Sequence, residues 1–309
     1  MSCPLWLNDL LLHHRDAYEP DYNGHLTDHL PMMLLAMHGL GADRETIELR
    51  HRRYIRRLDV VDEFETPKLA RVEDGFGERR AYRALVRYFD DEIANSGVDD
   101  TLASHLPKIM SGWVRHAFHG TIRLAYGIRF SVESEVAAGL AYLASAGPDE
   151  DLARIGKGAT QSDRFAWPPS IDIETSRFDD RYDEVLKANT FAVHTHVLAE
   201  NERQVAEDVL ALFNHTQGFF PLHMVTGTHA LGICADAIEE NVDGLMNAGI
   251  SAAYLAIEAP MFVLSATPKP INMDFAHEVK VAFSCLDQAR RLNSVRYEKA
   301  SDIYGRPFA

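Results

Sequence analysis

The stretch Trp113–Arg129, WVRHAFHGTIRLAYGIR, indicates the class of fold. Its apolar side chains recur at steps of three or four residues, the period of a helix with a buried face: Val114, Phe118, Ile122, Ala125 and Ile128. His119 and Arg123 lie one turn apart on a neighbouring face, while Gly120 and Ala125 allow other backbones to approach closely. Polar side chains between packed faces need partners, because an unpaired buried donor or acceptor costs roughly 1–3 kcal/mol.

Helical patterns cover most of the remaining chain. Pro107 is expected to open the helix that contains Trp113–Arg129, and further helices are predicted over 26–40, 46–58, 78–94, 132–146, 179–198, 202–213, 221–239, 242–259 and 273–293. Only 190–197 alternates enough to suggest a short strand. These patterns predict an all-α fold, a single-domain multi-helix bundle over residues 1–309. Residues 149–177 are rich in Gly, Pro, Ser and Asp and are expected to form a lid or long loop, with an interdomain linker as the alternative.

Composition narrows the classes of function. A formal charge of −15 argues against nucleic acid as a partner. The one basic run, between Arg50 and Arg57, indicates a solvated helix face, with a phosphate site as the alternative. Three scattered cysteines, no layout of a signal peptide and no apolar run of about 20 residues lead us to expect a cytoplasmic protein that does not enter a membrane.

Histidines beside small and apolar neighbours recur in four stretches: 24–32, 118–120, 222–227 and 276–280. His25 and His29 are four residues apart and His277 and Lys280 are three apart, so each pair shares a face if helical. Imidazoles pointing into a helical bundle can hold a metal, although histidines with ordinary partners in the core remain the alternative. A ferritin-like di-iron centre is disfavoured, because the single Glu-x-x-His pair, Glu48 and His51, lies in the basic run.

In this order the four stretches resemble the signature of the questin oxidase-like family: a histidine before a Pro-Met pair, His-Gly-x-Ile-Arg, His-x-x-Thr-Gly and His-x-x-Lys. Members resemble a mononuclear non-heme iron dioxygenase that cleaves a ring carbon–carbon bond of an anthraquinone, with iron held by four histidines and a carboxylated lysine. The resemblance implies five metal ligands here: His29, His119, His223, His277 and Lys280. His229, about 240° around the helix from His223, is expected to be a partner in the bundle or a surface residue.

Carboxylation of Lys280 requires its neutral amine, so its pKa must fall from about 10.4 through burial or a nearby cation. Apolar neighbours are consistent with burial, while a lysine that reaches the surface is the alternative. Four imidazoles and one anionic oxygen suit iron(II), with an octahedral position left for dioxygen or substrate. His25 could orient a ligand, act as a base or replace a ligand. Arg123 and Tyr126 could anchor a phenolate or carboxylate, with a structural ion pair as the alternative for Arg123.

The expected function is therefore an iron-dependent oxygenase or oxidoreductase acting on a small aromatic phenol or quinone. Its cofactors would be Fe(II), or another divalent metal, and a carbamate on Lys280 derived from carbon dioxide, with dioxygen as co-substrate. A metal-dependent hydrolase with the same ligands and a non-catalytic helical protein are the alternatives. No complete dinucleotide-binding motif is found, so the sequence indicates no place for a nicotinamide.

Overall fold

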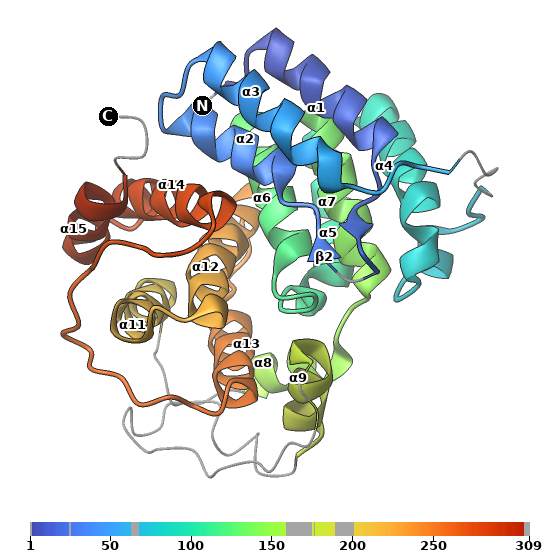
Figure 1. The fold of residues 1–309 in the computed structure, drawn as a ribbon. Coiled ribbons are helices and arrows are strands. Elements are labelled where there is room, and N and C mark those ends of the chain that lie inside the picture. Colours follow the sequence, from blue (N-terminus) through green and yellow to red (C-terminus); the bar gives the residue numbers. More distant parts are fainter. Residues whose placement is uncertain are drawn as a thin grey trace.

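A computed structural model of the chain describes residues 2–24, 26–62, 68–158, 175, 177–188 and 201–305. Fourteen α-helices within these residues form one mostly helical body, so the predicted fold class is confirmed (Figure 1). In the described part of the chain, the sole sheet pairs β1 (Asp21–Tyr22) with β2 (Leu26–Thr27), antiparallel. No helix of the described residues has both the length and the apolar character needed to cross a membrane.

The first half of the chain forms one group of helices. Its members are α1 (Leu5–Ala17), α2 (Leu30–Gly39), α3 (Arg44–Tyr54), α4 (Tyr82–Ser96), α5 (Val98–Ile109), α6 (His119–Phe130) and α7 (Glu133–Ala146), with short 3₁₀ turns η1 (Ile55–Arg57), η2 (Val72–Gly75), η3 (Arg79–Ala81) and η4 (Met110–Gly112). Helices α6 and α7 pack very closely. A Cβ atom added at Gly139 would lie 2.3 Å from the Cα of Leu124, and one at Gly120 would lie 3.0 Å from the backbone nitrogen of Leu143. The predicted close approach at Gly120 is therefore confirmed.

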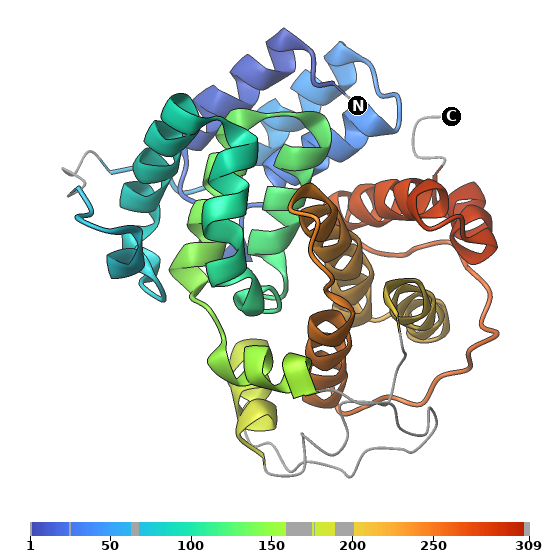
Figure 2. The same ribbon diagram turned by 180° about the vertical axis from the view of Figure 1, so that it is seen from behind.

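The second half contributes α8 (Glu150–Gly158), α9 (Phe178–Lys187), α11 (Glu202–Thr216), α12 (Phe219–Ala237), α13 (Asp243–Ala256), α14 (Phe275–Arg291) and α15 (Val295–Tyr304). Figure 2 shows α12 and α13 between the green helices of the first half and α11. Helix α12 packs on α6, and α14 packs on both α2 and α12. The two halves therefore meet where α2, α6, α12 and α14 converge, near the middle of Figure 1.

Four predicted element boundaries are wrong. The helix expected over 179–198 ends at Lys187, because Ala188 is extended, and residues 189–198 lie outside the described residues. The helix expected to open at Pro107 is split: Pro107 lies inside α5, residues 113–118 form turns, and α6 begins at His119. The helix expected over 26–40 begins only at Leu30, because Leu26 and Thr27 pair with β1. The loop expected over 149–177 starts with α8, while residues 159–174 and 176 lie outside the described residues, as does the possible strand over 190–197.

Candidate metal centre

His29 is the residue that precedes α2. Its backbone N–H donates to the Tyr54 hydroxyl at 3.0 Å, and its carbonyl accepts from the Met33 N–H at 2.9 Å. Pro31 in the first turn favours the start of the helix here, because its missing N–H has no partner to lose at this position. The backbone of His29 is thus fixed on both sides, and its imidazole points from the start of α2 towards His119 at the start of α6.

His119 begins α6 after an unusual turn. His116, Ala117 and Phe118 all have positive φ angles, of 52°, 50° and 70°. Residues without a glycine's freedom rarely adopt this conformation, so surrounding contacts must stabilise it. One such contact is a hydrogen bond that the His116 N–H donates to the Asp179 carboxylate at 2.9 Å. The turn brings the His116 carbonyl to 2.5 Å from His119 Nδ1, which donates to it and leaves Nε2 as the ligand atom.

His223 and His277 are held in the same way. In the first turns of α12, the Nδ1–H of His223 donates to the Phe219 carbonyl at 2.8 Å. In the first turn of α14, the Nδ1–H of His277 donates to the Asp274 carboxylate, which also accepts from the His277 backbone N–H at 3.4 Å. A hydrogen bond from Nδ1 to a carbonyl or carboxylate is the usual arrangement of a histidine that binds a metal through Nε2.

The four imidazoles form a closed ring. Neighbouring ring centroids are 4.7 Å apart for His29 and His119, 5.0 Å for His119 and His223, 5.0 Å for His223 and His277, and 4.7 Å for His277 and His29. The Nε2 atoms of His29 and His119 are 2.7 Å apart, and ligand atoms of His29, His223 and His277 lie within 4.8 Å of one another. Nitrogens bound at about 2.1 Å to one ion are about 3–4 Å apart, so these atoms are close to a coordinating arrangement.

Lys280 lies one turn after His277 on α14 and is completely buried. Burial lowers the pKa of its ammonium from 10.5 to about 7. The Lys280 charge in turn acts on all four rings: after burial, it is among the causes that lower the pKa values of His29, His119, His223 and His277. At neutral pH the imidazoles are therefore uncharged and their lone pairs are available.

Unsatisfied polar atoms test whether these residues fit a metal. Within the described residues, Nε2 of His223, Nε2 of His277 and Nζ of Lys280 are buried without a hydrogen-bond partner. Each such atom costs roughly 1–3 kcal/mol when nothing binds it, and three in one place are unusual. A divalent cation bound at the centre of the four imidazoles would satisfy the two nitrogens at once, so the residues present fit a metal ion.

Of the three residues predicted to be catalytic, Arg123 and Tyr126 lie within the described part of the chain. Arg123 forms a buried ion pair with Glu135, with Nε–Oε2 and Nη2–Oε1 distances of 2.7 and 3.2 Å, and it also donates to the Tyr82 hydroxyl. This arrangement matches the structural alternative for Arg123. Tyr126 packs its buried ring on Phe130 and Phe283, and its hydroxyl lies 3.5 Å from the Lys280 carbonyl.

His25 lies outside the described residues. Residues 26–28 are not helical, so the expectation that His25 and His29 share a helical face is wrong. His229 is a buried partner in the bundle, as one of its two interpretations expected: its ring nitrogens lie 3.0 Å from Ser284 Oγ and 3.0 Å from the Asp287 carboxylate.

Three contributors to the site were missed in the sequence. Asp274 could have been found, because an aspartate three residues before a histidine at the start of a helix can both cap that helix and bind the ring. Tyr54, which holds the backbone of His29, lies 25 residues away in sequence and carries no local signal. Phe219 is 48% exposed, yet its ring lies 4.4 Å from that of His223 and 5.1 Å from that of His277.

Comparison with known proteins agrees with this geometry. No curated protein matches the chain. The model of the questin oxidase-like family matches residues 26–281, a range that contains all four imidazoles of the ring and Lys280. The match covers most of the chain, and so the protein belongs to the questin oxidase-like family.

Proposed function

We propose that the protein is a metal-dependent oxidase that uses iron(II) and dioxygen on a small aromatic phenol or quinone. One observation carries the proposal: four neutral imidazoles from α2, α6, α12 and α14 surround one point, and two of them leave Nε2 buried without a partner. His29, His119, His223 and His277 would hold the ion. When bound, iron(II) would supply electron transfer between the substrate and dioxygen.

Lys280 is proposed as a fifth ligand after carboxylation. The neutral amine attacks the carbon of carbon dioxide, a nitrogen–carbon bond forms, one carbon–oxygen electron pair moves onto oxygen, and the nitrogen releases a proton to water. The product is an anionic oxygen ligand on a long arm. Complete burial and an unpartnered Nζ favour the reaction, since the amine has no ion pair to give up. The first turns of α6, α12 and α14 meet here, and the positive ends of their dipoles favour an anion.

The position of Phe219 suggests where an aromatic substrate would bind. Phe219 presents an exposed ring beside His223 and His277 and offers a stacking surface for another ring. The hydrogen bonds from Nδ1 of three histidines keep the ring of imidazoles rigid, which reduces the reorganisation needed during reaction. The proposed reaction is cleavage of a ring carbon–carbon bond, as in the dioxygenase that members of the family resemble.

Metal content and oxygen uptake test this function together. Protein purified without chelators should contain about one iron per chain, and it should consume dioxygen with some members of a panel of phenols and quinones. Lys280→Ala should lose most of the metal, and millimolar acetate should restore part of it. Lys299→Ala, at an exposed lysine of α15, is the matched control and should keep the metal.

Three results would contradict the proposal. Protein without iron, manganese or zinc would exclude a metal enzyme. Metal-loaded protein that hydrolyses esters but consumes no dioxygen would identify the hydrolase alternative. Unchanged metal content in Lys280→Ala would remove this lysine from the site.

A further inference from the structure

A basic groove lies against the metal centre, between α3 and the start of α14. Its volume is about 300 Å³, enough for a small aromatic acid. The lining residues come from α2, α3, η1 and the first turn of α14: Met33, Arg50, Arg53, Tyr54, Arg57, Asp274, Phe275 and Ala276. Three arginines against one aspartate make this groove positive in a chain whose formal charge is −15.

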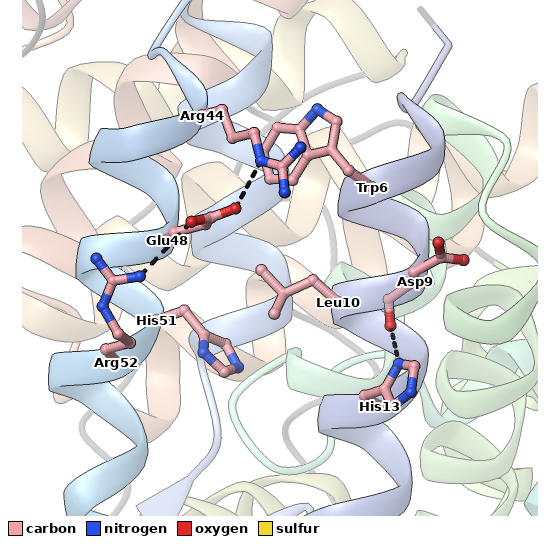
Figure 3. A pocket seen from close by; sticks show the side chains of 8 residues that line it. All are labelled: Trp6, Asp9, Leu10, His13, Arg44, Glu48, His51 and Arg52. Carbon is pink, nitrogen blue, oxygen red and sulfur yellow. Dashed lines mark hydrogen bonds and ion pairs between the residues drawn. The ribbon is translucent and has the colours of Figure 1, made fainter.

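On the other face of α3, arginines form ion pairs with a carboxylate. Figure 3 shows a second pocket, between α1 and α3, where Glu48 lies between Arg44 and Arg52. The shortest distances from Glu48 are 2.6 Å to Arg44 and 3.6 Å to Arg52. This face therefore carries paired charges, as is common along exposed helices.

Among the described residues, the groove arginines lack such partners. No carboxylate of the described residues forms an ion pair with Arg50, Arg53 or Arg57. Two of them instead lie over aromatic rings: the guanidinium carbon of Arg50 is 3.7 Å from the ring centre of Phe275, and that of Arg57 is 3.6 Å from that of Tyr54. Stacking fixes the guanidinium planes and leaves their N–H edges available to donate.

The walls of the groove are also the supports of two candidate metal ligands. The Tyr54 hydroxyl accepts from the backbone of His29, and the Asp274 carboxylate accepts from the ring of His277. A molecule held by the arginines thus lies beside the residues that position the metal site. Phe275 is partly exposed beside Arg50 and adds apolar surface, and the guanidiniums offer donors to an oxyanion.

From this geometry we propose that the groove binds the carboxylate of an aromatic acid and thereby selects anionic over neutral substrates. The inference rests on the proposed function for its meaning as substrate recognition. Binding itself requires neither iron nor dioxygen, so the two proposals can fail separately.

The test measures binding of 2-naphthoate and of its uncharged analogue 2-naphthamide to metal-free protein, by calorimetry at low ionic strength. The acid should bind about tenfold more tightly than the amide, and the preference should shrink in 0.5 M salt. Arg53→Gln and Arg57→Gln should each weaken naphthoate binding about two- to fivefold. Arg56→Gln is the matched control, because this exposed arginine is on η1 but does not line the groove.

Equal affinities for acid and amide, or naphthoate binding unaffected in the Arg53→Gln, Arg57→Gln double variant, would overturn the proposal. Inorganic phosphate that binds as tightly as naphthoate would show an anion site without aromatic selection, which also contradicts it. Arg53→Lys checks for misfolding, since it keeps the charge and should retain more binding than Arg53→Gln. Oxygen uptake with aromatic acids but not with their amides would link the groove to turnover.

Discussion

Replacing Lys280 with methionine should stabilise the metal-free protein at neutral pH. Methionine fills a similar volume without a charge, whereas the buried lysine must release a proton or remain charged without a partner. The pKa of Lys280 is about 7 in the folded protein and 10.5 as an ordinary lysine. Between these values the unfolded chain binds more protons than the folded one, so stability rises with pH across this window.

The size of the effect follows from the same two values. Their difference corresponds to roughly 4 kcal/mol of lost stability at pH 7, falling to roughly 2 kcal/mol at pH 9. Lys280→Met should recover an amount of this order at pH 7 and should remove the slope between pH 7 and 9. Urea unfolding of chelator-treated protein in buffer free of carbon dioxide measures both quantities.

The control is Lys299→Met, at an exposed position where the same substitution should change stability by less than about 0.5 kcal/mol. If Lys280→Met destabilises the metal-free protein, or keeps the pH slope of the unchanged chain, then Lys280 is not a buried amine without a partner. Such a result would contradict the proposal that Lys280 is the fifth ligand.

Other substitutions test separate parts of the structure. Asp274→Asn should weaken metal binding about 10- to 100-fold, measured by competition with a chelator, because His277 loses the carboxylate that orients it; unchanged affinity would contradict this role. Arg123→Met should cost roughly 3–5 kcal/mol in unfolding experiments by leaving Glu135 buried without its partner, with metal content per folded chain unaltered. If this variant lost metal while remaining stable, Arg123 would belong to the site instead. Gly139→Ala should lower the thermal midpoint because α7 cannot move away from α6 without loss of packing, and an unchanged midpoint would show that these helices adjust easily.

The sequence predicted the helical class and the family well, because both depend on patterns that extend along the whole chain. It could not predict where α6 begins. Val114 and Phe118 continue the helical period and both are buried, yet a turn stabilised in part by Asp179, over 60 residues later, interrupts the helix. A local pattern contains no information about such a partner.

The candidate site, too, could be predicted only in part from the sequence. Short motifs identified four histidines and Lys280, and the structure brings them to one place. The partner of Arg123 and the support that Tyr54 gives to His29 depend on contacts between separate helices. Whether an arginine serves a substrate or a structural ion pair is decided by such contacts, so sequence alone left both interpretations open for Arg123.

The most direct test of the account is a diffraction experiment on iron-loaded crystals, with anomalous data collected on both sides of the iron edge. The account predicts one strong peak per chain, about 2.1–2.2 Å from Nε2 of His29, His119, His223 and His277, with density for a carboxylated Lys280 on the same ion. A peak elsewhere, or an iron-free site with these imidazoles turned away from one another, would contradict it.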